Sequence, residues 1–119
     1  ITTTVGQGEK AVWGKPSPWC DYSGTIQDVG VRGVTFFDHP SNLRHPTRWH
    51  VRSYGLMAAN CFGLKDFEPN GGQSGDWTLR NGESQVFRYR TLIHSGDVKE
   101  AKVAERYAAF ATPPQASWK

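Results

Sequence analysis

The chain has 119 residues and a formal net charge of +3, and 37% of its residues are hydrophobic. This length suits a single β-rich domain, residues 1–119, or part of a longer one. No segment approaches the roughly 20 apolar residues that cross a bilayer, which argues against a membrane protein. The basic residues are scattered, so no nucleic-acid partner is expected. The chain begins with Ile1 and shows no signal peptide, so we expect a soluble protein whose compartment, including export, stays open.

Short strands and many turns are predicted, because the chain holds 13 glycines and 7 prolines. In the first third of the chain we expect strands at residues 1–5, 11–13, 19–27 and 31–38. Residues 39–46 hold two prolines and are predicted to form a loop. Residues 48–54 alternate, with Trp49 and Val51 on a buried face and His50 on a polar one. The short apolar segment 56–62 is ambiguous between strand and turn.

A β-hairpin is predicted near the C-terminal end. Residues 77–79 and 84–94 have strand character, and Asn81-Gly82 between them is a strong hairpin signal. A glycine-rich loop at residues 68–76 precedes this hairpin.

One helix is predicted over residues 98–111. Asp97 is a good N-cap, and Glu100 three residues later completes a capping box. Pro113 and Pro114 end the helix. Apolar residues recur at helical spacing and give the helix one face to bury. They are Val98, Ala101, Ala104, Tyr107, Ala108 and Ala111.

Side chains capable of acid–base chemistry are concentrated between residues 19 and 60, where His39, His45 and His50 lie close together in sequence. Histidine titrates near neutrality, so it can take up or give a proton at a reacting centre. We predict His39 and His50 as the catalytic acid–base groups, with Asp21 as their carboxylate partner. Asp38 is the alternative partner.

The same region carries side chains that suit a small polar ligand, and a sugar or sugar acid is the class we expect. Guanidinium groups suit a ring oxygen or a carboxylate substituent, amides suit hydroxyl groups, and flat rings suit the apolar face of a sugar. The predicted ligand-binding residues are Trp19, Tyr22, Asn42, Arg48, Arg52, Asn60 and His94.

Structural interpretations compete with these roles. The histidine spacing matches no metal signature, so we predict no bound metal and no cofactor. The alternative to a chemical role for the histidines is a hydrogen-bonded network that shapes the loop. Cys20 and Cys61 match no metal or redox motif; a disulfide and two buried free thiols both stay open. Arginines on neighbouring strands suit a structural ladder with aromatic and acidic residues. They are Arg48, Arg52, Arg88 and Arg90.

Three blocks of sequence resemble the bacterial PmoA-like family, which is labelled "methane oxygenase PmoA" but has no assigned function. They are WCDYSG, GVTFFDHPSNLRHPTRWHVRSYGLMAANCFG and FRYRTLIHSGD. The resemblance covers roughly residues 11–111 and implies the C-terminal part of a longer domain. It implies a galactose-mutarotase-like β-supersandwich, which is a likeness of fold and assigns no function. A missing N-terminal half or a partner chain is therefore expected to complete the domain.

The sequence thus predicts a mainly β protein, an antiparallel β-sandwich with one C-terminal helix. The first functional hypothesis is a carbohydrate-processing or carbohydrate-binding protein whose reaction is unassigned. The second is a non-catalytic binding or assembly domain. The third, which follows the family label, is a component of a metal-dependent oxygenase.

Overall fold

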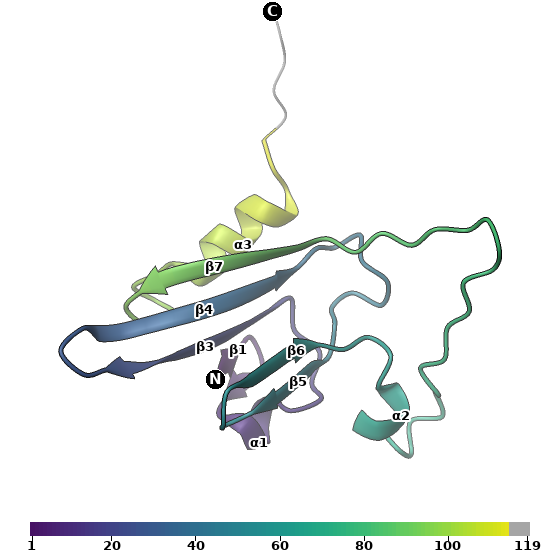
Figure 1. The fold of residues 1–119 in the computed structure, drawn as a ribbon, viewed down its shortest axis with the longest axis horizontal. Helices are drawn as coiled ribbons and strands as arrows, with labels where there is room; N and C mark the ends of the chain where they lie inside the picture. Colours follow the sequence, from purple (N-terminus) through teal and green to yellow (C-terminus); the bar gives the residue numbers. More distant parts are fainter. Residues whose placement is uncertain (115–119) are drawn as a thin grey trace, which may run out of the picture.

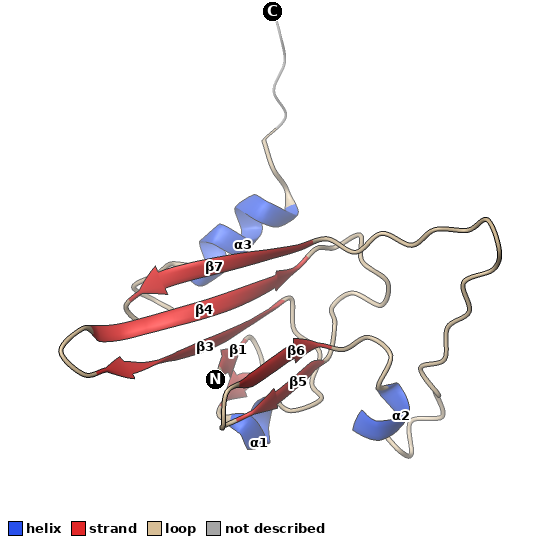
Figure 2. Ribbon diagram, in the orientation of Figure 1, coloured by secondary structure: helices blue, strands red, loops and turns tan. Residues whose placement is uncertain are grey.

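Two antiparallel sheets and three helices make up the described part of the chain, residues 1–114 of a computed structural model. The strands are β1 (Thr2–Thr3), β2 (Gly6–Gln7), β3 (Trp19–Ile26), β4 (Gly30–Asp38), β5 (Trp49–Arg52), β6 (Leu56–Ala59) and β7 (Tyr89–Ser95), and the helices are α1 (Glu9–Val12), α2 (Leu64–Phe67) and α3 (Val103–Ala111). The larger sheet has the order β2-β1-β3-β4-β7, and the hairpin β5–β6 forms the smaller sheet (Figures 1 and 2). The predicted fold class, mainly antiparallel β with a C-terminal helix, is confirmed.

Strands β3 and β4 form the centre of the larger sheet and confirm the strands predicted at residues 19–27 and 31–38. They pair in register from Trp19 opposite Phe37 to Ile26 opposite Gly30, and β4 also pairs with β7. Successive side chains of a strand point to opposite faces. Because β4 is central and both of its faces pack against other elements, its apolar residues do not alternate with polar ones.

The two faces of this sheet pack against different elements. Trp19 and Phe37 pack against α3 and the turn before it, and α3 lies beside β4 and β7 in Figure 1. The neighbouring Cys20 packs on the other face against Trp49 and Val51 of the hairpin. Trp49 and Val51 have exposed fractions of 0%, which confirms the buried face predicted for their strand. Each large side chain buried in this way contributes about 1.5–3 kcal/mol.

Two predicted segments differ from the structure. The strand predicted at residues 11–13 is wrong, because residues 9–12 form the short helix α1, whose Val12 N–H donates to the Gly8 carbonyl. The hairpin predicted across Asn81-Gly82 is also wrong. Arg80 and Glu83 do form a turn there, but residues 77–88 form no ladder, and β7 makes its backbone pairs with β4 instead. Tertiary pairing thus overrides a local hairpin signal.

The capping box predicted at Asp97 forms, but the helix begins later than predicted. The Asp97 carboxylate accepts hydrogen bonds from the N–H groups of Lys99 and Glu100, and the Glu100 carboxylate accepts the Asp97 N–H. A turn occupies residues 98–102, and Lys102 then adopts a left-handed conformation with φ of 50°. The α-helix therefore starts at Val103 and ends at Ala111, before the two prolines, as predicted.

We expect Asp97→Ala to lower the free energy of unfolding, because two backbone N–H groups lose their acceptor. Those hydrogen bonds lower the pKa of Asp97 below its usual value. A carboxylate whose pKa is depressed by folding stabilises the protein above its unfolded-state pKa, and this contribution disappears as the pH falls through the folded-state pKa. The loss in Asp97→Ala should therefore be larger at about pH 7 than at about pH 3, as measured by urea unfolding.

The matched control is Asp66→Ala, at an exposed carboxylate that makes no side-chain hydrogen bond within residues 1–114. It should change stability little at either pH. Equal losses for Asp97→Ala at both pH values would show that the charged cap does not contribute.

Candidate functional site

The carboxylate of Asp38 lies buried at the end of β4 and organises the loop that follows. Its side chain is 1% exposed. Oδ1 accepts a hydrogen bond from Asn42 Nδ2 at 2.7 Å, and Oδ2 accepts one from the Thr47 N–H at 2.8 Å. His45 Nδ1 also contacts Oδ2, at 2.7 Å. Three donors from one loop therefore converge on a single carboxylate, which compensates for its loss of water.

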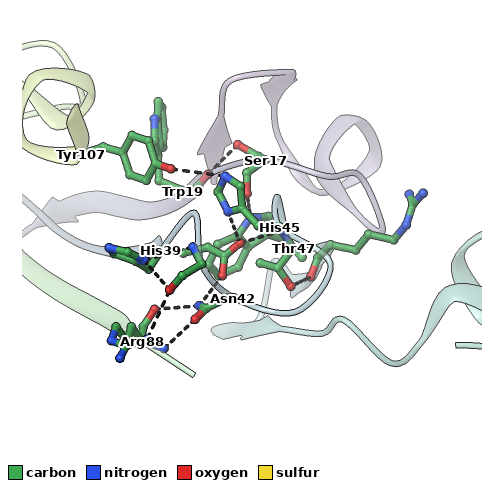
Figure 3. Close-up of polar contacts among 12 residues, drawn as sticks. Ser17, Trp19, His39, Asn42, His45, Thr47, Arg88 and Tyr107 are labelled. Atoms are coloured by element: carbon green, nitrogen blue, oxygen red, sulfur yellow. Dashed lines mark hydrogen bonds and ion pairs between the residues drawn. The ribbon is translucent and has the colours of Figure 1, made fainter. Parts of the chain in front are cut away.

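His45 is the member of this network that reaches the surface. Its side chain is 20% exposed, and its Nδ1 faces the Asp38 carboxylate. A carboxylate accepts, so Nδ1 carries a proton, and in the neutral ring Nε2 is the nitrogen that accepts. Nε2 lies 3.5 Å from the Tyr107 hydroxyl of α3 (Figure 3). An imidazole oriented by a carboxylate, on a side chain that is partly exposed, is the arrangement of a general base.

Tyr107 and Tyr89 lie close enough to Asp38 for its charge to affect them. Burial, together with that negative charge, raises the pKa of Tyr107 above its ordinary value. Burial raises the pKa of Tyr89 to about 12, with smaller contributions from Asp38 and Cys61. Both phenols therefore keep their protons at neutral pH and can act as hydrogen-bond donors.

Asn42 fixes the Asp38 loop to the segment that enters β7. Its Oδ1 accepts the Arg88 N–H at 2.7 Å, and its Nδ2 donates to the Arg88 carbonyl at 2.7 Å as well as to Asp38. Figure 3 shows this paired contact beside His45. The amide that we predicted to bind a ligand is thus used by the protein's own backbone.

A second Asp–His pair crosses the helix-facing side of the larger sheet. His94 Nε2 of β7 contacts Asp21 Oδ1 of β3 at 2.7 Å, and the Thr35 hydroxyl of β4 donates to the same oxygen at 2.6 Å. The side chains of His94 and Asp21 are 5% and 0% exposed. Two predicted site residues, Asp21 and His94, are therefore in contact, although we had expected Asp21 to partner His39 and His50.

Gly33 makes room for this second pair. It sits opposite both Ser23 and His94 in the sheet register, and a Cβ atom at Gly33 would lie 2.4 Å from His94 Cε1. The missing side chain lets the imidazole lie across β4 and reach Asp21. Asp21 Oδ2 and His94 Nδ1 are buried and have no hydrogen-bond partner within residues 1–114. The pair is thus shielded from solvent and only partly satisfied.

The two histidines predicted to be catalytic lie apart in separate environments. His39 Nδ1 is 2.8 Å from the Ser41 hydroxyl, and its ring packs against Phe110 of α3. His50 lies on the hairpin, with its ring against Trp13 and Phe67. No contact within residues 1–114 joins either ring to the other or to Asp21. Their catalytic roles stay predictions.

The predicted aromatic contacts differ in character. Trp19 is 7% exposed and packs in the core against Phe37. Tyr22 lines an apolar pocket on the hairpin side of the sheet with Val34 and Met57, and its hydroxyl donates to the Ser53 carbonyl at 2.6 Å. Placement favours a structural role for Trp19, whereas the Tyr22 ring borders open space.

The remaining predicted ligand-binding residues already make contacts within the protein. Arg48 donates to the Gly14 carbonyl and pairs with Glu68 at 2.9 Å. Asn60 Oδ1 accepts the N–H groups of Phe62 and Gly63, so it shapes the turn after β6. Arg52 lies over the ring of Trp13 at 5.2 Å and contacts Glu9. The predicted arginine ladder does not form, because Arg90 lies over Phe110 and Arg88 contacts Ser41.

Both cysteines are buried free thiols, so the disulfide that we left open is absent. Burial raises the pKa of Cys20 to about 12 and also raises that of Cys61. In the part of the chain that the structure describes, no group of three or more His, Cys, Asp and Glu side chains is arranged to hold a metal ion. None of the helices described there is long and apolar enough to cross a membrane.

Comparison with known proteins places residues 1–108 in a family of unknown function, DUF6807. The chain belongs to this family. No curated protein and no solved structure matches it. Membership of DUF6807 brings no activity with it, and the PmoA-like label and the galactose-mutarotase likeness stay untested resemblances.

Three features of these networks were missed: the pairing of His45 with Asp38, which we had named only as an alternative partner, and the parts of Tyr107 and Gly33. A signal existed for the pair and for Gly33. Asp38 closes a predicted strand and His45 lies seven residues later in a loop, which is close enough for a contact. Gly33 interrupts a strand of large residues, a pattern that often marks close approach of another group. Tyr107 carried no such signal, because it fitted the apolar face of its helix.

We expect Gly33→Ala to destabilise the fold by about 2–3 kcal/mol, because the new methyl group displaces His94 and breaks its contact with Asp21. Gly24→Ala is the matched control in the neighbouring strand, where a Cβ meets no atom within 4 Å. It should be neutral or slightly stabilising. Urea unfolding of both variants measures the difference, and equal effects would contradict the role given to Gly33.

Proposed function

We propose that this chain carries out general acid–base chemistry on a carbohydrate, with His45 as the proton-transferring group and Asp38 as its positioning residue. The observation that carries the proposal is the 2.7 Å contact between the buried Asp38 carboxylate and His45 Nδ1, combined with the partial exposure of the imidazole. In the other pair, Asp21 and His94 are almost fully enclosed. Proton transfer to a ligand requires a reachable nitrogen, which favours His45.

The geometry suggests how protons would move. A ligand hydroxyl takes the place of the Tyr107 hydroxyl at His45 Nε2 and gives its proton to this nitrogen, and Asp38 stabilises the imidazolium that forms. The same imidazolium then returns the proton to another oxygen. Tyr107, whose raised pKa keeps it protonated, then donates its hydrogen bond to the ligand oxygen instead of to Nε2. One oriented histidine can thus serve as base and acid in turn, as sugar-ring opening and closing at an anomeric carbon require.

A carbohydrate is favoured as the ligand class by exposed aromatic rings at the same end of the sheet. Tyr89 is opposite Asp38 in the strand register and is 46% exposed. Its ring stacks with Phe87, which contacts Phe62, and Phe62 in turn contacts Trp77. Phe62 and Trp77 are 47% and 38% exposed. Flat rings beside hydrogen-bonding groups suit the apolar faces of sugars.

The same aromatic cluster favours one alternative, a carbohydrate-binding domain without turnover. In that case the rings bind the sugar and the Asp38 network only holds the loop in place. The oxygenase alternative gains no support from side-chain placement within residues 1–114, where no three potential metal ligands cluster.

The test begins with a thermal-shift screen over neutral sugars and sugar acids. Ligands found in this way are then followed by proton NMR in D₂O, which detects both anomeric conversion and exchange of ring hydrogens. We expect His45→Gln to lower turnover by about 100-fold or more while binding is retained, since it removes the proton-transferring nitrogen.

His50→Gln provides a direct comparison, because His50 was the acid–base group predicted from sequence. A loss of turnover in His50→Gln with none in His45→Gln would contradict our assignment. Binding by the wild-type protein without any turnover would replace the catalytic proposal with the binding domain.

A further inference from the structure

A pocket of about 170 Å³ lies beside the loop that carries His45, and two arginines line it. Arg44 and Pro46, the neighbours of His45 in sequence, belong to its wall together with Arg48, Cys61 and Gln73. At roughly 30 Å³ for each water molecule in the liquid, this volume accommodates a group of a few heavy atoms, such as a carboxylate or a phosphate.

Arg44 brings an uncompensated positive charge to this pocket. Its guanidinium donates to three backbone carbonyls, those of Cys61, Gly75 and Asp76, at 2.7–2.9 Å. Carbonyl groups orient the guanidinium without neutralising it. The ion pairs found within residues 1–114 do not include Arg44. A guanidinium has five N–H donors, so two are not used by these three contacts.

Arg48 adds a second guanidinium, and only one carboxylate balances the two. It donates to the Gly14 carbonyl, and its other nitrogen pairs with Glu68, whose side chain is 50% exposed. The pocket lining itself contains these two guanidinium groups and no carboxylate. Burial raises the pKa of Cys61 in the same wall; the charge of Arg44 lowers it and the charge of Asp38 adds to the rise.

The backbone at Arg44 supports a fixed position for this charge. Arg44 adopts a left-handed conformation with φ of 58°, which is unfavourable for a residue with a Cβ atom. The three carbonyl contacts of its side chain offset this cost. The side chain is therefore held in place in advance of binding, which lowers the entropy lost when a ligand arrives.

We propose that the pocket between Arg44 and Arg48 binds the carboxylate or phosphate group of a small ligand. Guanidinium groups bind such anions through paired, charge-assisted hydrogen bonds. The amide of Gln73 lies in the wall to supply a further donor. This site goes beyond the acid–base proposal, because anion binding here requires no proton transfer by His45. If both proposals hold, the ligand of the whole chain is a sugar acid or a sugar phosphate.

The experiment titrates the whole chain with inorganic phosphate and, separately, with D-glucuronate at constant ionic strength. Calorimetry measures affinity, and amide chemical shifts in ¹⁵N NMR locate the site. D-glucose is the uncharged counterpart of glucuronate and should not shift the pocket residues. Saturable binding by phosphate alone or by glucuronate alone supports the site and identifies the anion that it takes.

Two glutamine variants provide a matched pair that leaves the fold intact. Gln73→Glu places a negative charge in the pocket wall at an exposed position, and Gln7→Glu makes the same change at an exposed position of β2. We expect Gln73→Glu to weaken binding by about tenfold, through repulsion across a few ångströms, and Gln7→Glu to leave it within about twofold. Equal weakening by both variants, or no saturable binding of either anion by the wild-type chain, would overturn the proposal.

Discussion

One buried carboxylate determines the arrangement of the whole region between β4 and β5. Asp38 loses its water at the end of a central strand and regains hydrogen bonds only if the following loop folds back toward it. Asn42, His45 and Thr47 are the residues that do so. Leaving any one of these contacts unmade costs about 1–3 kcal/mol, so the loop has one favoured conformation. Through Asn42 the same constraint extends to the backbone that enters β7.

The two Asp–His pairs use the same chemistry in different surroundings. Asp21 and His94 are buried on the face of the larger sheet that packs against α3, and Gly33 provides the space for their contact. This pair ties three strands together, and its two buried atoms without partners mean that it gains less than a fully satisfied network would. Asp38 and His45 form a pair of the same length in which the imidazole side chain is 20% exposed. The greater exposure of the His45 side chain thus makes its pair a candidate reactive group, whereas the buried Asp21–His94 pair acts as a cross-link between strands.

The sequence predicted those features that depend on neighbouring residues. Strand character at β3 and β4, the alternation around Trp49 and the capping box at Asp97 all follow from local pattern, and the structure confirms them. The strand wrongly predicted at residues 11–13 is a local error, because a short helix forms there, whereas the wrong hairpin and the missed Asp21–His94 contact depend on distant partners. The hairpin signal at Asn81-Gly82 fails because β7 pairs with β4 instead. The contact of Asp21 with His94 spans 73 positions and passes over a glycine in a third strand, which no local pattern specifies.

The sequence predicted which residue types gather at the candidate site but not which side chains contact each other there. The region rich in histidine and arginine is the one that holds the Asp38 network, yet His39 and His50 face different aromatic neighbours. Many predicted ligand-binding groups instead hold the protein's own backbone, as Asn42 and Asn60 do. Residue type thus indicated where polar chemistry gathers, whereas loop geometry determined which side chains remain available.

The most direct test of this account is the protonation state of the His45 ring, read by two-dimensional ¹H–¹⁵N NMR of its imidazole nitrogens. Asp38 should hold the proton on Nδ1, giving a slowly exchanging, strongly downfield Nδ1–H signal that disappears in Asp38→Ala. A ring with its proton mainly on Nε2, or one that averages like a free imidazole and is unchanged by Asp38→Ala, would contradict the carboxylate's role in orienting His45.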